Sequence, residues 1–302
     1  MSDVIAVGVD AGGTTTRVAV SENGVPAGSA EGPGANATTL GVDDAADAIV
    51  AVVRKALEHR KPAAIVVGAA GAGRAAVAGT LEELIGSAFA GCRVSAGDDA
   101  RIALRAAIPE GPGIVLIAGT GSIAYAENGD RRARVGGLGY LAGDEGSAFA
   151  LGMAAVRLYG RVLDGRARAD ETTDLVARAL DAPDRDAYLH ALYNAPLVPA
   201  TIAALAPSII AFAGKGNRVA TKLVQTTASD LGDLIRDAAR GCDLKEASPS
   251  VALAGGLFGE NSLLSYLLEL RIINELPGAS ILRGGDGAAI GALRLAELLA
   301  AQ

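Results

Sequence analysis

The sequence has few cysteine, histidine and aromatic residues. Among 302 residues there are two cysteines, two histidines and no tryptophan, and the aromatic side chains together make up 3%. Cys92 and Cys242 stand far apart and lack the paired spacing of zinc ligands, so neither a zinc site nor a disulfide framework is expected. The chain is long enough to bury a sizeable core, and its stability must come from that core.

Long hydrophobic runs and basic clusters are also missing. The longest apolar runs fall well short of the ~20 residues that cross a bilayer, and the opening MSDVIAV lacks the basic segment and apolar core of a signal peptide. The formal net charge is −7, and no stretch gathers more than a few Lys or Arg. A surface for nucleic acid or anionic membranes is therefore not expected, and we predict a cytoplasmic protein that binds neither.

Glycine and aliphatic residues are abundant instead. Half of the residues are apolar, and the 40 glycines cluster in short turns between apolar runs, which is typical of an α/β enzyme. Strands are expected at residues 4–9 and 17–20. A helix capped by Asp43 or Asp44 is expected to follow, with one apolar face made by Ala46, Ile49, Val50, Val53 and Leu57.

The pattern of the first strands returns in the middle of the chain. Residues 113–137, GIVLIAGTGSIAYAENGDRRARVGG, again predict a strand, a glycine–hydroxyl turn, a strand and a hairpin. The turn-rich segment Pro109–Gly113 is the candidate domain boundary. Two related α/β lobes that face a cleft are the organisation that this repetition favours.

The first glycine turn carries the clearest chemical signal. In VIAVGVDAGGTTTRVAV, residues 4–20, the acidic Asp10 precedes two glycines and three threonines. Glycine turns expose backbone N–H groups that can hold phosphate oxygens, and a carboxylate beside them calls for a cation such as Mg²⁺. An ordinary tight hairpin is the alternative for this motif alone. The similar AGTGS at 118–122 and LAGGL at 253–257 favour a nucleotide site.

Six motifs together resemble a known superfamily. VGVDAGGTTTRVAV, GDDA, IAGTGSIA, GGLGYLAGDEGSAF, LAGGLF and GGDGAAIGAL occur in the order seen in sugar kinases, actin and heat-shock ATPases. The chain is most similar to the N-acetylglucosamine kinase and BadF/BadG/BcrA/BcrD ATPase branch. The resemblance implies an α/β fold of two actin-like (ribonuclease H-like) lobes around a nucleotide- and sugar-binding cleft. The smaller lobe would comprise residues 1–109 with the C-terminal helix 287–302, and the larger lobe residues 110–286.

The resemblance also implies which residues bind ATP. In such proteins the first turn holds the β- and γ-phosphates, its Asp acts through Mg²⁺, the second turn holds phosphates from the other lobe, and a late Gly-Gly packs on adenosine. The matching residues here are Asp10, the one metal contact, with Gly12, Gly13, Thr14, Thr15, Gly119, Thr120, Gly121, Ser122, Gly255 and Gly256.

A kinase for a hydroxyl group also needs a carboxylate that accepts the proton. In GDDA two aspartates precede a helix, and either could simply cap it. The family pattern selects Asp99 as the base, also in contact with the sugar, and leaves Asp98 as its neighbour or cap. The other sugar-contacting residues that the resemblance implies are Asn36, Gly71, Gly137 and Asp144. For the segment GDEGSAF, which contains Asp144, the alternative is that its polar residues serve the start of a helix, with Ser147 as the cap.

The resemblance predicts an ATP-dependent kinase for the 6-hydroxyl of an amino sugar. N-acetylglucosamine is the first choice of substrate, followed by glucosamine or N-acetylmuramic acid. Leu138 and Tyr140 stand where animal relatives have Trp and His, which leaves the contacts to the 2-acetamido group open. A BadF-type ATPase that activates a radical acyl-CoA enzyme is the alternative of another class. A non-catalytic sugar sensor is a third reading, and a homodimer is one option for the assembly.

Overall fold

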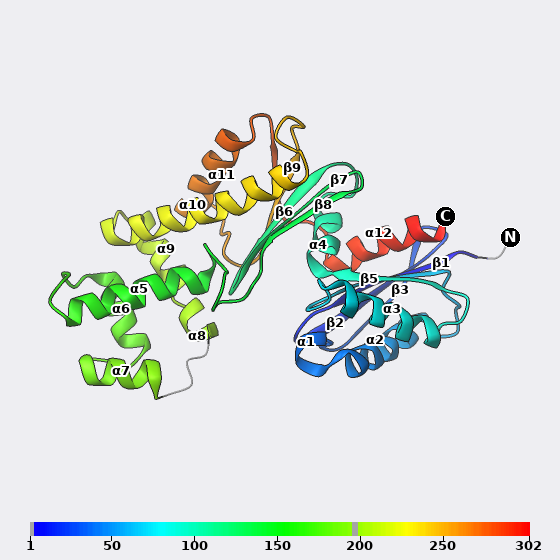
Figure 1. The fold of residues 1–302 in the computed structure, drawn as a ribbon, viewed down its shortest axis with the longest axis horizontal. Helices are drawn as coiled ribbons and strands as arrows, with labels where there is room; N and C mark the ends of the chain where they lie inside the picture. Colours follow the sequence, from blue (N-terminus) through cyan, green and yellow to red (C-terminus); the bar gives the residue numbers. More distant parts are fainter. Residues whose placement is uncertain (1–2, 195–198) are drawn as a thin grey trace. The chain divides into compact units, whose positions relative to one another are not determined.

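The computed structural model describes residues 3–194 and 199–302. It divides into two compact units, of which the first contains the chain up to Gly111 together with Gly284–Gln302 (Figure 1). The second unit is Pro112–Arg283. Each unit is built on one five-stranded sheet with helices packed against it, so the α/β class predicted from the sequence is confirmed.

The sheet of the first unit has the strand order β3-β2-β1-β4-β5. Its strands are β1 (Ile5–Ala11), β2 (Thr15–Glu22), β3 (Val25–Pro33), β4 (Ala64–Ala69) and β5 (Arg93–Asp98). The three strands β1, β2 and β3 form an antiparallel meander, whereas β4 and β5 run parallel to β1. Because β1, β4 and β5 are parallel, their carboxyl ends meet at one edge of the sheet.

Five helices belong to this unit, namely α1 (Ala37–Leu40), α2 (Val42–Leu57), α3 (Ala75–Ala88), α4 (Asp99–Ala107) and α12 (Ala288–Ala300). The five apolar residues predicted for one face of α2 are all buried. The predicted cap of this helix was wrong. Its N-cap is Gly41, at φ +89°. Asp43 and Asp44 lie within the first turn, where their negative charge interacts favourably with the helix dipole but does not cap the helix.

Strand β1 separates two hydrophobic cores, because successive side chains point to opposite faces of a sheet. Ile5, Val7 and Val9 face the core that α2 covers. Ala6 lies on the other face with the residues of α12. At Gly8 the backbones of β1 and α12 touch, since a Cβ there would lie 2.1 Å from the backbone nitrogen of Leu293. Only glycine permits this approach.

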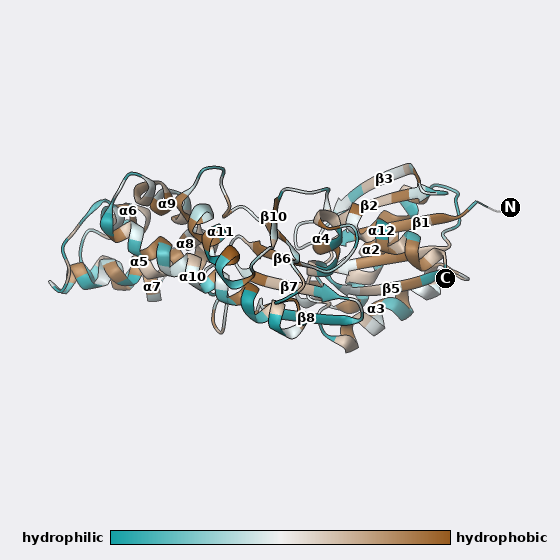
Figure 2. Cartoon of the chain, turned by 90° about the horizontal axis from the view of Figure 1, so that it is seen from above, coloured by the Kyte–Doolittle hydropathy of each residue, from teal (hydrophilic) through white to brown (hydrophobic). Residues whose placement is uncertain are grey.

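The sheet of the second unit repeats the topology of the first, with the order β10-β9-β6-β7-β8. Its strands are β6 (Gly113–Ala118), β7 (Ser122–Asn128), β8 (Arg131–Gly136), β9 (Ser250–Ala254) and β10 (Ser280–Arg283). The central strand β6 is apolar and the edge strand β8 is hydrophilic (Figure 2). Charged side chains on an edge strand oppose pairing with other chains.

The described helices of the second unit lie mainly between β8 and β9 in the sequence. They are α5 (Ala148–Leu163), α6 (Glu171–Ala179), α7 (Arg185–Tyr193), α8 (Pro199–Ala203), α9 (Ala206–Gly214), α10 (Arg218–Gly241) and, after β9, α11 (Leu263–Glu275). The long α10 buries one face against the sheet and α11. Within residues 3–194 and 199–302, no helix combines the length and apolar character needed to span a bilayer.

Candidate functional site

The first glycine turn connects β1 to β2 within a hairpin. Ala11 pairs with Thr16, and the N–H of Gly12 donates to the carbonyl of Thr15 at 3.0 Å. Gly13 and Thr14 are exposed, and a Cβ on Gly13 would meet no atom within 4 Å. The turn therefore presents bare backbone to solvent, as a phosphate-binding nest requires.

Asp10 lies inside β1, one residue before the strand ends, and not in the turn itself. It is adjacent to Gly68 of β4 in the sheet register, and Gly68 is adjacent to Gly97 of β5. Burial raises the pKa of Asp10, and Arg17 on the neighbouring strand opposes this effect. The side chain of Ile102 packs over Gly68, where a Cβ would lie 2.4 Å from it, whereas a Cβ on Gly97 would meet no atom within 4 Å.

Asp98 is the last residue of β5 and Asp99 follows it, at the same edge. Asp98 is the N-cap of α4, and its Oδ1 accepts a hydrogen bond from the N–H of Ala100 at 3.0 Å, as the capping interpretation predicted. Asp99 is the first residue of the helix. Burial raises the pKa of Asp99 to about 6, with further contributions from a hydrogen bond with Asp98 and from the charges of Asp98 and Asp10. These three carboxyl groups therefore form one electrostatically connected cluster.

Asn36 and Gly71 lie next to each other in this unit. Asn36 caps α1 by accepting from the N–H of Thr38 at 2.8 Å, and its side-chain amide nitrogen donates to no described residue. Gly71 has φ +86°, and a Cβ there would lie 2.3 Å from the hydroxyl of Thr38 and 3.2 Å from Oδ1 of Asn36. The fold thus brings together two residues that are 35 positions apart in the sequence.

The carboxylate of Asp10 has a donor chemistry that fits Mg²⁺. It forms no hydrogen bond or ion pair with the described residues, and its raised pKa means that a nearby cation would stabilise its charge. No described group of three Asp, Glu, His or Cys residues is arranged to hold a metal. Magnesium commonly takes one or two protein carboxylates and completes its shell with water and substrate phosphates, so a single aspartate suffices.

The second glycine turn joins β6 to β7 and is shorter. Ala118 pairs with Ser122, and the N–H of Gly119 donates to the carbonyl of Gly121 at 2.9 Å. Helix α5 begins against this turn, because the N–H of Ala148 donates to the carbonyl of Gly119 at 2.8 Å. Ser147 caps the helix as predicted, with its Oγ accepting from the N–H of Ala150. The exposed Thr120 lies at the tip.

Asp144 packs directly on the second turn. It is 8% exposed, and its Oδ1 accepts from the backbone N–H of Ser122 at 3.3 Å. A Cβ on Gly121 would lie 2.9 Å from Oδ2 of Asp144, so glycine makes this approach possible. The backbone at Asp144 is left-handed, with φ +59°. The hydroxyl of Ser122 donates to the carbonyl of Glu145 at 2.7 Å, and the N–H of Gly137 donates to the carbonyl of Ser122 at 2.8 Å.

The late Gly-Gly pair follows β9. Gly255, at φ +101°, approaches the end of β6 so closely that a Cβ would lie 2.2 Å from the carbonyl oxygen of Ala118. The N–H of Leu257 also donates to that oxygen, at 3.1 Å. Gly256 has open space around it and lines a cavity of about 320 Å³. Pro207, Ile210 and Ala211 of α9 form the apolar wall of this cavity.

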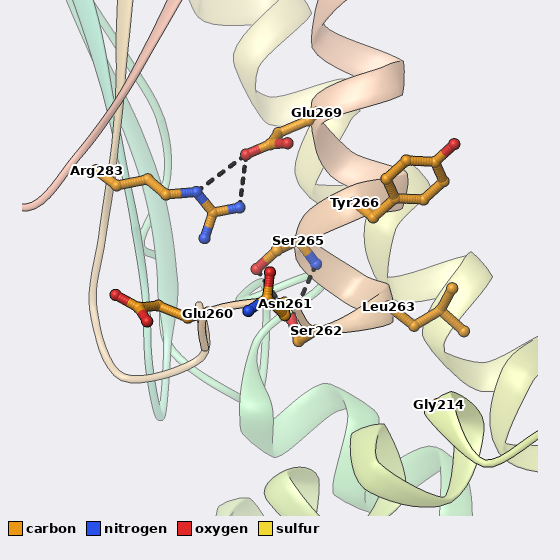
Figure 3. Close-up of a pocket in the computed structure, with 9 residues that line it drawn as sticks. All are labelled: Gly214, Glu260, Asn261, Ser262, Leu263, Ser265, Tyr266, Glu269 and Arg283. Atoms are coloured by element: carbon orange, nitrogen blue, oxygen red, sulfur yellow. Dashed lines mark hydrogen bonds and ion pairs between the residues drawn. The ribbon is translucent and has the colours of Figure 1, made fainter.

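A second cavity of about 640 Å³ adjoins the first, since both are lined by Gly214, Asn261, Ser262 and Leu263. The Arg283–Glu269 ion pair lies on its wall, at 2.6 Å (Figure 3). Apart from Gly256, no residue that lines these cavities was predicted from the sequence as a site residue. The polar segment GENS after the Gly-Gly pair was a usable signal, but the wall from α9 has no motif.

The predicted site residues thus form two groups. The first unit brings Asp10, Asn36, Gly71, Asp98 and Asp99 to the loops at one sheet edge. The second unit brings the turn at 119–122 together with Gly137, Asp144 and the Gly-Gly pair. Both groups lie at the carboxyl ends of parallel strands, which is the usual ligand-binding edge of α/β sheets.

Residues 7–296 match the BadF/BadG/BcrA/BcrD ATPase family. An N-acetyl-D-glucosamine kinase of Dictyostelium discoideum is 29% identical over 98% of both chains. An N-acetylmuramic acid/N-acetylglucosamine kinase of Clostridium acetobutylicum is 26% identical over 78% of this chain and 77% of its own.

Solved structures show the same fold. That of a candidate N-acetylglucosamine kinase from Chromobacterium violaceum matches with a TM-score of 0.72 and 28% identity over 99% of both chains. A ROK hexokinase of Thermus thermophilus matches with a TM-score of 0.61 and 18% identity, over 99% of this chain and 100% of its own. The resemblance drawn from the six motifs is confirmed, and the chain belongs to the BadF/BadG/BcrA/BcrD ATPase family.

Proposed function

We propose that this protein is an ATP-dependent kinase that phosphorylates the 6-hydroxyl of an amino sugar, with N-acetylglucosamine as the first choice. Two relatives support the substrate class, because one is named an N-acetyl-D-glucosamine kinase and the other an N-acetylmuramic acid/N-acetylglucosamine kinase. N-acetylmuramic acid and glucosamine are the alternative substrates. With ATP as the donor, we expect the enzyme to act in the cytoplasm.

The observation that carries the proposal is the position and acidity of Asp99. A kinase base must take the proton of the attacking hydroxyl as the new oxygen–phosphorus bond forms and the bond to ADP breaks. General bases work best when their pKa lies near the working pH. With a pKa raised to about 6, Asp99 is ionised at neutral pH and is a stronger base than an ordinary aspartate.

The neighbours of Asp99 have separate roles in this mechanism. Asp98 caps α4 and so fixes the backbone from which Asp99 projects. The amide nitrogen of Asn36 donates to no described residue, and we assign Asn36 and Gly71 to the sugar; a side chain on Gly71 would collide with Thr38 in the cap that Asn36 forms. Asp10 would hold Mg²⁺, which, when bound, neutralises charge on the phosphates.

We assign the nucleotide to glycine backbone in both units. Within Gly12 to Thr15 and Gly119 to Ser122, the N–H groups of Gly13, Thr14, Thr120 and Gly121 would hold phosphate oxygens, because those of Gly12, Gly119 and Ser122 already donate within the protein. The apolar cavity beside Gly256 has the size and lining of a site for a nucleobase. We assign Gly137 and Asp144 to the sugar; Asp144 is also anchored to the second turn through Ser122.

The alternative activator function would need cysteines that can hold an iron–sulfur cluster. Cys242 is fully buried, and its Sγ donates to the carbonyl of Ala126 at 3.3 Å. Burial raises the pKa of the Cys92 thiol to about 11, which opposes formation of the thiolate that binds iron. Both observations favour the kinase.

A coupled assay of ADP release over a panel of sugars tests the proposal. We expect release with N-acetylglucosamine at saturating ATP and Mg²⁺, and a 6-phosphate product identified by ³¹P NMR. Glucose, N-acetylmuramic acid, glucosamine and a 6-deoxy analogue serve as comparisons, and the 6-deoxy sugar should give no turnover. If no sugar raises ADP release while the nucleotide demonstrably binds, the protein is not a sugar kinase.

A further inference from the structure

A third cavity, of about 420 Å³, lies among helices of the second unit, away from the glycine turns in the sequence. The last turns of α5, the residues that follow it and the first turn of α7 form its walls. The charged residues of this lining are Arg157, Arg161, Asp164, Arg166 and Arg185. We call this group the arginine pocket.

The arginine pocket has four positive side chains and one negative one. Asp164 forms ion pairs with Arg166 at 2.8 Å and with Arg185 at 2.6 Å. Arg157 and Arg161, one turn apart on α5, are exposed and form no ion pair with any described residue. Like charges at this spacing repel each other. The pocket therefore keeps an excess of positive charge that no described carboxylate neutralises.

Protonation of Asp164 does not change this balance at neutral pH. A hydrogen bond from Arg166 and the charge of Arg185 lower the pKa of Asp164, so this group is ionised. Two other aspartates, Asp184 and Asp186, belong to the start of α7. The carboxylate of Asp184 is occupied in capping α7, where it accepts from the N–H of Ala187 at 2.9 Å, and neither aspartate lines the pocket.

The rest of the lining is apolar or aromatic. Leu163, Tyr188 and Leu189 face the cavity with Gly160. The hydroxyl of Tyr188 donates to the carbonyl of Val156 at 2.9 Å, which fixes the ring, and a Cβ on Gly160 would lie 3.0 Å from that hydroxyl. The pocket thus combines arginine guanidinium groups with an apolar and aromatic wall that can contact a carbon skeleton.

A purely structural role explains only part of this arrangement. Cations near the end of α5 stabilise the helix dipole, and the two ion pairs of Asp164 tie the loop after α5 to α7. The dipole effect accounts for Arg161, which lies in the last turn of α5, but neither effect accounts for Arg157 one turn earlier. Guanidinium groups bind phosphate oxygens in pairs, and one dianion can satisfy several of them.

We propose that the arginine pocket binds the phosphate group of a small organic phosphate, with Arg157 and Arg161 as its main contacts and Tyr188 and Leu189 against the carbon skeleton. The cavity volume matches a small molecule. The chain carries a net charge of −7, so the local positive charge is not part of a general surface for polyanions. This inference does not depend on the proposed kinase function.

Phenyl phosphate is a suitable probe, because it pairs a dianion with an apolar ring. In ¹H–¹⁵N spectra of the whole protein, we expect the amide signals of Gly160, Leu163 and Leu189, which line the pocket, to shift in a saturable way. The double variant Arg157→Ala/Arg161→Ala should raise the dissociation constant read from these signals at least about tenfold. Arg178→Ala/Arg218→Ala is the matched control; it removes the same charge from exposed residues outside the pocket, and affinity should stay within about twofold.

Signals at the glycine turns separate this site from the proposed nucleotide site, since the phosphate can also bind there. Shifts confined to residues 119–122, or equal losses in the pocket variant and the control, would overturn the proposal. The absence of any shift at the three pocket amides in the unmodified protein would do the same. Arg157→Gln/Arg161→Gln, with thermal unfolding measured for each variant, keeps the test decisive if the alanine variant is unstable.

Discussion

Strand β1 of the first unit and strand β6 of the second occupy the same central place in sheets of the same order, and each ends in a glycine turn. Their flanking residues differ. Where the first unit has Asp10, one residue before the strand ends, the second unit has Ile117. The last parallel strand of the first unit ends in Asp98 and is followed by Asp99, whereas that of the second unit ends in Arg283 and is followed by Gly284.

The comparison shows how one scaffold can be divided between two tasks. The acidic side chains at the strand ends of the first unit are suited to hold a cation and move a proton. In the second unit a glycine follows each of β6, β9 and β10, and the nearby buried Asp144 is held against the turn by the N–H of Ser122. Bare backbone binds phosphate without adding charge that would oppose it.

The strongest test of this division replaces the candidate base. We expect Asp99→Asn to lower kcat by ~10²–10⁴-fold with little change in KM for ATP, because the amide cannot accept a proton. Asp98→Asn is the matched control: it removes the same charge one residue away, Asn is a good N-cap, and kcat should stay within a few-fold. Steady-state kinetics and thermal unfolding of both variants give the answer. If Asp98→Asn is the inactive variant, the base is one residue earlier.

The next largest effect is expected at Asp10. Asp10→Asn should reduce kcat by about 10²-fold or more, because a neutral side chain no longer holds Mg²⁺ against the phosphates. The dissociation constant of a non-hydrolysable ATP analogue should change much less, since the backbone of the turn is intact. Titration of Mg²⁺ at fixed ATP should show a raised requirement for the metal. Near-normal turnover at moderate Mg²⁺ would show that Asp10 does not hold the metal.

The glycine pair of the second unit separates folding from binding. Gly255→Ala should lower the free energy of unfolding by about 2–4 kcal/mol, because the new Cβ would collide with the carbonyl of Ala118 at an unfavourable positive φ. Gly256→Ala has open space and should leave stability within about 0.5 kcal/mol. Its KM for ATP should still rise, by about tenfold, if the nucleoside packs on this residue. Urea unfolding and steady-state kinetics of both variants test this. An unchanged KM for ATP in Gly256→Ala would mean that the nucleoside does not pack on this residue.

The smallest expected effect concerns pH and stability. The pKa of Asp99 is raised to about 6 in the folded protein from an ordinary value of 3.8, so folding favours its protonated form. Its contribution to stability is therefore full below pH 3.8 and is lost as pH rises through 6. Asp99→Asn should stabilise the protein at pH 8, on the order of 1 kcal/mol, and the gain should vanish near pH 4. A pH-independent difference between the two unfolding curves would contradict the raised pKa.

The sequence predicted the fold class because alternating apolar residues and two similar glycine hairpins appear directly in it. Capping by Asp98 and Ser147 was also readable, since it depends on residues within three positions of the helix start. The start of α2 could not be predicted in this way, because its N-cap is a glycine at positive φ and not the expected aspartate. Contact of Asp144 with Gly121 spans 23 positions and uses a left-handed backbone, and local patterns carry no information on either.

The close approach of α12 to Gly8 also has a consequence for the order of assembly. The first unit is completed by a helix that begins 190 residues after the end of its own sheet, with the whole second unit between them. During translation, the apolar face of β1 that carries Ala6 must wait uncovered until residues 288–300 have left the ribosome, whereas all parts of the second unit have emerged by then. Until α12 packs, the sheet of the first unit therefore stays open on one face while the chain of the second unit is synthesised.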